Sequence, residues 1–302
     1  MTLDDGNDFP GGGKARGAAF WRASRRRVAG VLLLIMAVAA AGPCCSHRSE
    51  RVIESPAGRV GRASDLRIGT YNVHVKAHDL PGTVAVLKAM DADVIALQEV
   101  TPESAKGLDG ALAGLYPYRF FASGLGIVSR FPLREPHFQK SPTGINGFLF
   151  AGIEHPRGRV QMANIHLDPL RLWTGRDLMM LPLQFGRNRT IQRAELVRVN
   201  ENLAPGAPTL LVGDFNRVSD EVIDKLRSGG FTDSFADVMK DADGISTLHF
   251  SLLGMHFGKR IDFIFHDRHF HTVRSRVIPG LPSDHDAVVT RLAWDDAAVA
   301  GR

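Results

Sequence analysis

Cysteine is almost absent from this chain of 302 residues. Its only two cysteines, Cys44 and Cys45, are adjacent and lie near the N-terminus, so residues 46–302 contain no thiol. A disulfide framework is therefore excluded within that part, and so is a zinc site built from cysteine thiolates. With 44% hydrophobic residues, the chain can instead be stabilised by burying a large apolar core.

Two common catalytic motifs are also missing. The chain has no Gly-x-Ser-x-Gly sequence, which would provide a serine nucleophile elbow. It has no Gly-x-x-x-x-Gly-Lys sequence, which would provide a phosphate-binding loop. No internal repeat is visible either.

An excess of positive charge is missing from most of the chain. The formal charge of +5 arises from residues 1–63, which hold ten Lys and Arg against five Asp and Glu. The remaining residues hold 27 of each sign and eleven of the twelve histidines. Overall charge therefore gives no argument for binding nucleic acid.

No apolar run reaches the ~20 residues that a transmembrane helix needs. The run at residues 28–42 has fifteen residues, follows Arg25-Arg26-Arg27 and ends in small residues before Pro43. This pattern predicts a secretory signal that resembles a twin-arginine signal, with a retained membrane anchor as the alternative. Lipidation at Cys44 is a further alternative, although Pro43 departs from the usual lipobox. We expect the protein to be extracytoplasmic, either periplasmic or secreted. The predicted organisation is a signal or anchor at 1–45, a linker at 46–64, a folded domain at 65–296 and a tail at 297–302.

Several apolar strands of the predicted domain end in polar residues. The run at 209–212 is typical of a buried strand, and it is followed by Gly213, Asp214 and Asn216. Because strand side chains alternate, Asp214 and Asn216 can face the same way. The same pattern places polar residues at five further strand ends: Asn72, Glu99, His166, Asp262, and Asp284 with His285. Helical spacing is predicted for residues 83–90 and 190–203.

Each of these polar residues also has a simple structural interpretation. Asn72 could form a turn, His166 could be a hydrogen-bonded core histidine, and Asp262 could pair with Arg260. Together, however, they suit one task, the hydrolysis of a phosphate ester with the help of a hard cation. Carboxylate and amide oxygens are the ligands that Mg²⁺ or Mn²⁺ prefers, and a histidine beside a carboxylate can transfer protons near neutral pH.

The motifs together resemble the endonuclease/exonuclease/phosphatase superfamily, which has the DNase I-like fold. The resemblance runs in order from about Asp65 to Trp294 and rests on these motifs: Thr70-Tyr71-Asn72, Gln98-Glu99, Gly126-Ile127-Val128-Ser129-Arg130, Asn164-Ile165-His166, Gly213-Asp214-Phe215-Asn216, Arg260-Ile261-Asp262 and Ser283-Asp284-His285. It implies a four-layer α/β (α+β) sandwich, in which two packed mixed β-sheets are flanked by helices and the site lies at one edge.

The resemblance also implies roles for the residues. Glu99, with Asn72 nearby and help from Asp284, would hold Mg²⁺ or Mn²⁺. Asp214 would position or deprotonate the attacking water. His285, oriented by Asp262, would contact the scissile phosphate, while Asn216 and His166 would stabilise the charge of the transition state.

The substrate is less clearly indicated, because the chain departs from several family patterns. Residues 120–124 offer no acid to pair with the second histidine, and the Cys-Asp-Arg segment of inositol phosphatases is replaced by Gly258-Lys259-Arg260. The segment at 170–189 mixes aromatic and basic residues, which suits nucleic acid but also suits a lipid interface. The residues predicted to bind substrate are Arg171, Trp173, Arg176, Arg187 and Arg260.

We therefore expect an exported phosphodiester hydrolase that acts as a monomer, with extracytoplasmic nucleic acid as the first candidate substrate. The alternatives are a phospholipid or sphingomyelin phosphodiesterase, which would associate with a membrane, and a non-catalytic scaffold that binds phosphorylated ligands. Plasmid nicking that weakens with salt indicates the first, liposome binding the second, and chelator-insensitive binding without turnover the third.

Overall fold

The computed structural model describes residues 48–55, 62, 64–75, 78–170, 180–217, 219–252 and 255–296. The expected leader at 1–45 and tail at 297–302 lie outside these residues. Within the described part, no helix combines the length and apolarity that crossing a bilayer requires.

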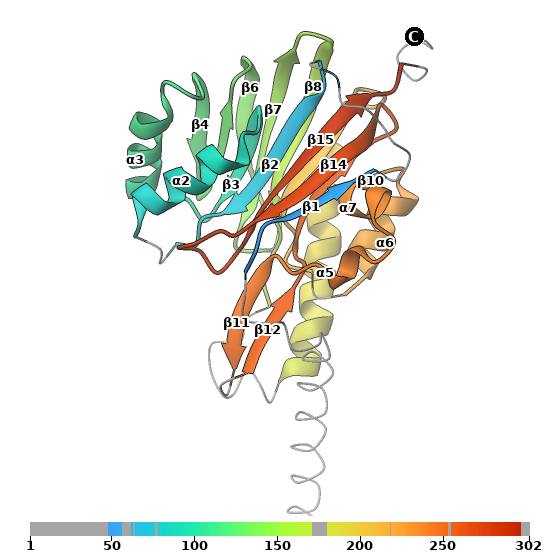
Figure 1. Ribbon diagram of the computed structural model, residues 1–302. Coiled ribbons are helices and arrows are strands. Elements are labelled where there is room, and N and C mark those ends of the chain that lie inside the picture. The colour runs from blue at the N-terminus through green and yellow to red at the C-terminus, as the bar shows by residue number, and fades with distance from the viewer. Residues whose placement is uncertain are drawn as a thin grey trace, which may run out of the picture.

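Two β-sheets form the centre of the molecule (Figure 1). The seven-stranded sheet has, in spatial order, β1 (Arg51–Glu54), β14 (Phe270–Ile278), β15 (Ala287–Trp294), β2 (Leu66–Asn72), β3 (Val94–Gln98), β5 (Leu125–Ser129) and β4 (Tyr118–Ala122). The six-stranded sheet has, in spatial order, β10 (Thr232–Asp233), β13 (Asp262–His266), β9 (Thr209–Asp214), β8 (Gly158–His166), β7 (Gly147–His155) and β6 (Leu133–Lys140). Both sheets are mixed, because β2–β3 and β8–β9 are parallel pairs among antiparallel ones.

Three hydrophobic clusters hold the layers together. The largest lies between the sheets and joins residues such as Leu66, Val94, Leu149 and Ile264. A second packs the seven-stranded sheet against α2 (Leu80–Met90) and α3 (Pro102–Leu112), and a third packs the six-stranded sheet against α5 (Leu181–Glu201) and α6 (Glu221–Ser228). The short helix α7 (Ser234–Val238) follows β10. Figure 1 shows α2 and α3 on one side of the sheets and α5 and α6 on the other, which is the expected four-layer sandwich.

The local sequence explains why the first two helices begin where they do. The Asp79 side chain accepts a hydrogen bond from the Gly82 amide at the start of α2, and the Thr101 side chain accepts one from the Ser104 amide at the start of α3. Each helix also has a proline in its first turn, where the missing amide proton costs nothing. The expected helix at 83–90 is thus confirmed.

Three elements differ from the sequence expectations. β1 lies within residues 46–64, for which the sequence predicts a linker, and it pairs with the edge strand β14. The helix expected at 190–203 begins earlier, at Leu181. Residues 248–259, for which the sequence analysis predicts no element, form a separate hairpin of β11 (Leu248–Leu252) and β12 (Met255–Lys259).

Candidate active site

Asp214 is the last residue of β9 and lies between two strands whose ends also carry candidate residues. In the β-sheet register it faces His166 on β8 and Asp262 on β13. The preceding Gly213 has φ +147°, and a Cβ atom there would lie 1.9 Å from the carbonyl oxygen of Ile165. Only glycine therefore allows β8 and β9 to approach this closely where Asp214 enters the site.

Asp214, Asp262 and His285 form a buried cluster whose ligand atoms lie within 4.8 Å of one another. The Nδ1 atom of His285 lies 2.9 Å from Oδ2 of Asp262, and its Nε2 atom lies 3.9 Å from Oδ2 of Asp214. Asp262 thus orients the imidazole, whose other nitrogen faces Asp214. This is the pairing that the sequence analysis expects for Asp262 and His285.

Burial and neighbouring charges set the proton affinities in this cluster. Burial, and then the charge of Asp262, raise the pKa of Asp214 to about 6. Burial alone would lower the pKa of His285, but the Asp262 carboxylate outweighs it and raises the pKa to about 10. At neutral pH, Asp214 can therefore accept a proton while His285 carries one.

Glu99 and Asn72 lie beside Asp214. The Asn72 amide nitrogen donates to Oε1 of Glu99 and to Oδ2 of Asp214, both at 3.1 Å, so one side chain connects the two carboxylates. Glu99 has φ +57°, a left-handed conformation that is unusual for this residue and typical of functional sites. Burial would raise the pKa of Glu99, but hydrogen bonds from the Val75 amide and from Asn72 lower it below its ordinary value. Glu99 is therefore held as an anion.

His166 and Asn216 complete the surroundings of Asp214. The Nε2 atom of His166 is 3.7 Å from Oδ2 of Asp214, and burial lowers the pKa of this imidazole. The Asn216 backbone amide donates to Oδ1 of Asp214 at 2.8 Å, in a turn where Asn216 has φ +41°. The Asn216 side-chain amide nitrogen donates to the carbonyl oxygen of Leu167, which fixes its direction.

Asp284 lies at the edge of the site, and a histidine that the sequence analysis did not select lies next to it. Nδ1 of His74 is 3.1 Å from Oδ1 of Asp284 and 3.8 Å from Oε2 of Glu99. The backbone of His74 is left-handed, with φ +57°, and its amide donates to Asn72 Oδ1. His74 and His78 are spaced as His-x-x-x-His, a pattern in the sequence that could have identified His74.

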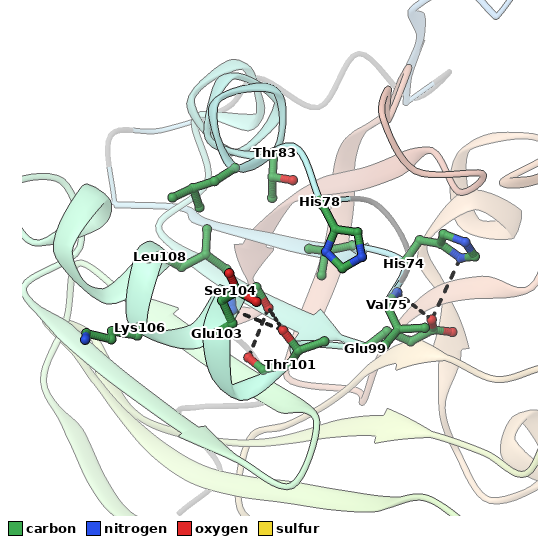
Figure 2. Close-up of a pocket in the computed structure, with 13 residues that line it drawn as sticks. His74, Val75, His78, Thr83, Glu99, Thr101, Glu103, Ser104, Lys106 and Leu108 are labelled. Atoms are coloured by element: carbon green, nitrogen blue, oxygen red, sulfur yellow. Dashed lines mark hydrogen bonds and ion pairs between the residues drawn. The ribbon is translucent and has the colours of Figure 1, made fainter.

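A cavity of about 430 Å³ opens beside Glu99 (Figure 2). It is lined by His74 and His78, by the start of α3 from Thr101 to Leu108, and by apolar side chains such as Leu80. Figure 2 shows the contacts that His74 and Val75 make with Glu99 at one end of this cavity. The cavity can therefore receive a chemical group that lies next to Glu99.

The donor set fits a hard divalent cation. Glu99 and Asp284 supply carboxylate oxygens near the Asn72 amide, and in the adjoining cluster Oδ1 of Asp262 is buried without a hydrogen-bond partner. Buried carboxylate oxygens without partners are costly unless a cation or water satisfies them. Glu99, Asn72 and Asp284 are thus the residues of this chain that would hold Mg²⁺ or Mn²⁺.

The residues expected to bind substrate are not brought together in the described part of the chain. Arg171, Trp173 and Arg176 lie outside the described residues, and Arg187 is exposed on α5. Arg260 is 2% exposed. Its guanidinium donates to both carboxylate oxygens of Asp233, at 3.0 and 2.7 Å. The structure thus places Arg260 in a buried ion pair that connects the start of β13 to β10, and this placement leaves no guanidinium face for a substrate.

Comparison with known proteins agrees with this geometry. A sequence model described as "Endonuclease/Exonuclease/phosphatase family" matches residues 69–285, a span that begins within β2 and ends at His285. The chain belongs to the endonuclease/exonuclease/phosphatase family. No curated protein matches the chain in sequence.

Solved structures of the family share the fold at low sequence identity. An endonuclease/exonuclease/phosphatase protein from Beutenbergia cavernae aligns with a TM-score of 0.57 at 19% identity, over 76% of this chain and 72% of its own. D. rerio TDP2 complexed with a single-strand DNA product aligns with a TM-score of 0.59 at 19% identity, over 76% of this chain and 99% of its own. Sphingomyelinase C from Streptomyces griseocarneus aligns with a TM-score of 0.52 at 16% identity, over 75% of this chain and 99% of its own.

Proposed function

We propose that this family member is an exported phosphodiester hydrolase that depends on a divalent cation. The observation that supports this most directly is the arrangement of Asp214, His285 and Asp262 beside Glu99. It combines a base, an oriented acid and a cation-binding carboxylate around one small space. Export is proposed from the leader sequence alone.

In the proposed reaction each residue has one task. Glu99, Asn72 and Asp284 would hold a divalent cation, which would supply positive charge to neutralise the phosphate. Asp214 orients the attacking water and accepts its proton. The P–O bond to the leaving group breaks as the water oxygen bonds to phosphorus, and His285, held by Asp262, gives its proton to the departing oxygen. His166 and Asn216 stabilise the additional negative charge of the transition state.

The class of reaction can be tested with bis-p-nitrophenyl phosphate, with and without EDTA. Wild type should release nitrophenol with Mg²⁺ or Mn²⁺ and stop when the cation is removed. Asp214→Asn should lower kcat by about 10²–10⁴-fold, because general-base catalysis contributes that much. Asp224→Asn, on the exposed face of α6, is the matched control and should leave the rate unchanged. Wild-type rates in EDTA, or in Asp214→Asn, would contradict the proposal.

Nucleic acid is the substrate that the sequence analysis places first. A structural relative was solved with a single-strand DNA product, which makes the fold compatible with such a substrate. The described arginines near this edge, however, are largely engaged by acids. Arg189 and Arg193 pair with Glu221, and Arg217 pairs with Asp220 and Asp243. Cations for a polyanion would therefore have to come mainly from the segment at 171–179, which lies outside the described residues.

The described surface favours the second candidate, a phospholipid phosphodiester. Large apolar side chains are exposed on several segments around the site: Val75 after β2, Ile145, Met180 and Leu183 at the start of α5, Phe250 and Met255 on the β11–β12 hairpin, and Leu281 in the loop before His285. Figure 1 shows the hairpin and one end of α5 extending from the same side of the sheets. Apolar side chains exposed on the hairpin and on this end of α5 support a surface that meets lipid or another apolar partner.

A substrate comparison separates the candidates. Plasmid DNA, RNA and sphingomyelin or phosphatidylcholine vesicles should be offered at 50 and 200 mM salt. Hydrolysis of lipid that persists at the higher salt supports the phospholipid candidate. Nicking of plasmid that falls steeply between the two salt concentrations supports the nucleic-acid candidate, because phosphate contacts release counterions. Binding of either substrate without turnover, with or without EDTA, supports the non-catalytic scaffold instead.

A further inference from the structure

Arg48 lies just after the expected leader, yet it contacts the loop that carries His285. Its Nη1 atom donates to the carbonyl oxygen of Ser283 at 2.8 Å, and its Nη2 atom donates to the carbonyl oxygen of His285 at 2.7 Å. Its Nε atom donates to Oδ1 of Asp286 at 2.8 Å. One guanidinium thus forms hydrogen bonds with three residues of the loop: Ser283, His285 and Asp286.

The position of Arg48 is fixed by β1. This strand pairs antiparallel with β14, with Arg51 opposite Val277, so the chain before Arg51 runs along the loop that follows β14. An ion pair between Glu50 and Arg276 supports the same register. The Arg48 side chain is 17% exposed, so its contacts are shielded from water and its hydrogen bonds are strengthened accordingly.

Asp286 is the centre of this arrangement. Its side chain is 5% exposed and accepts hydrogen bonds from the Gly280 amide at 3.0 Å and from Arg48. Its other oxygen lies 2.7 Å from Nε2 of His249 on β11. Because Asp286 follows His285 directly, a shift of its carboxylate would move the imidazole relative to Asp262 and Asp214.

We propose that Arg48 is a positioning residue of the active site, which holds the loop from Ser283 to Asp286 so that His285 meets both Asp262 and the phosphate. This inference rests on the proposed hydrolase function. The inference also gives the segment next to the leader a role in the folded domain. Processing of the exported protein must therefore leave Arg48 in the mature chain.

The test uses the full chain with Arg48→Gln, Arg48→Lys and the control Arg51→Gln, which removes the same charge from an exposed position three residues away. With bis-p-nitrophenyl phosphate and saturating Mg²⁺, Arg48→Gln should lower kcat by about 10²-fold while KM changes little, because a small misplacement of a catalytic group has this effect. Arg48→Lys should be intermediate, since it keeps the charge but lacks the planar fork that reaches several acceptors. Arg51→Gln should match wild type.

A second measurement separates positioning from stability and from the proposed function. The Nδ1 proton of His285, hydrogen-bonded to Asp262, should give a low-field ¹H resonance in wild type and in Arg51→Gln. It should be lost or broadened in Arg48→Gln at a temperature where circular dichroism shows the variant to be folded. If Arg48→Gln does not fold, the same comparison is made with Arg48→Lys.

Three results would overturn the inference. The first is that the folded Arg48 variants keep both kcat and the low-field resonance. The second is that kcat falls by no more than the fraction of the variant that is unfolded. The third is that mass spectrometry places the N-terminus of the mature protein after residue 48. If wild type has no hydrolase activity, the proposed function fails, and the resonance and the N-terminus still decide the role of Arg48.

Discussion

At the scale of single residues, the Asp262 carboxylate affects the pKa values of two neighbours, His285 and Asp214. It raises the proton affinity of His285 and, by repulsion, also raises that of Asp214. Burial raises the pKa of Asp214 and lowers that of His285, and the Asp262 carboxylate raises both, so the pKa is about 6 for the base and about 10 for the acid. Pairs of titratable groups whose pKa values are separated by their environment are typical of acid–base catalysis.

A bell-shaped pH dependence of kcat/KM follows from these values. Activity should rise as pH increases through about 6, where Asp214 loses its proton, and fall near pH 10, where His285 loses its proton. Asp262→Asn removes the carboxylate that stabilises the imidazolium, so the alkaline limb should move toward neutral pH. Rates of bis-p-nitrophenyl phosphate hydrolysis between pH 5 and 10.5 measure both limbs, with the exposed Asp109→Asn as control. An alkaline limb that stays in place in Asp262→Asn would contradict this assignment.

Glu195 on α5 is a second titrating residue, and it acts on stability. It is fully buried, where its Oε1 accepts from the Ser141 hydroxyl and its Oε2 accepts from the Asp168 amide. Burial raises its pKa from an ordinary 4.5 to about 7. Since the folded state binds this proton more tightly than the unfolded state does, stability should fall as pH rises from about 4.5 to about 7, by about 3 kcal/mol.

Glu195→Gln should remove this pH dependence, because the amide imitates the protonated acid. The free energy of unfolding in urea should exceed that of wild type at pH 8 and be close to it at pH 4.5. Glu201→Gln, at the exposed end of the same helix, should show no such difference. Equal effects of Glu195→Gln at both pH values would show that burial of the charge is not the cause.

The residues that the sequence predicts well are those that follow a buried strand. Asp214, Asp262 and His166 lie where strand periodicity places them, because a single register brings three strand ends together. Arg48 and His74 were missed for a different reason. Arg48 lies in a polar segment without periodicity and meets its partners across more than 230 residues. His74 is directed by a left-handed backbone, and only its spacing from His78 marks it in the sequence.

At the scale of elements, the parallel pair β8–β9 carries the site. Its strands end together at His166 and Asp214, and the close approach at Gly213 lets the Leu167 amide donate to the Asp214 carbonyl beyond the last pair. A side chain at residue 213 would collide with backbone atoms of β8, which cannot rotate away. The ends of the two strands would then have to separate.

Gly213→Ala should therefore destabilise the protein by at least about 3 kcal/mol, by steric collision and by the positive φ. Gly110→Ala is the matched control, since Gly110 lies in α3 and a Cβ atom added there would have no other atom within 4 Å, so it should stabilise by up to about 1 kcal/mol. Urea denaturation of both variants measures these values. A destabilisation of Gly213→Ala no larger than about 1 kcal/mol would mean that the strands tolerate a side chain there.

Elements at the sheet edges were predicted less well than those at its centre. The four residues of β1 alternate only weakly and are mostly exposed, so hydrophobic pattern gives no signal, and the strand exists because β14 offers an open edge. The early start of α5 has a similar cause. Residues 182–187 in its first turns are exposed or half-buried and carry no regular apolar pattern, and they continue a helix whose core-facing residues, such as Leu196 and Val199, lie further along the chain.

At the scale of the whole molecule, the two sheets pack face to face and both direct polar strand ends to one edge. Asn72 and Glu99 come from the seven-stranded sheet, while Asp214 and Asp262 come from the six-stranded sheet. Contacts across this boundary, such as the hydrogen bond from Asn72 to Asp214, therefore exist only when the sheets are packed. The hydrogen bond from Gln98 to Asn164 reinforces the same boundary deeper in the core.

The exposed apolar side chains near this edge give a final prediction about how the whole molecule meets its substrate. Phe250 is 40% exposed and Met255 is 53% exposed on the β11–β12 hairpin, and β11 reaches the site because Leu248 forms a β-bridge to His285. If the substrate lies in a bilayer, Phe250→Ser with Met255→Ser should weaken flotation with phosphatidylcholine vesicles and lower vesicle hydrolysis by about tenfold, since each buried apolar side chain contributes to interfacial binding. Turnover of bis-p-nitrophenyl phosphate should stay close to wild type, because a small soluble diester does not need this surface.

Leu115→Ser is the control, since Leu115 is also 40% exposed but lies after α3, and it should affect neither assay. Equal loss in both assays would show that the hairpin supports the fold of the site, and no loss in either would exclude the hairpin from substrate binding.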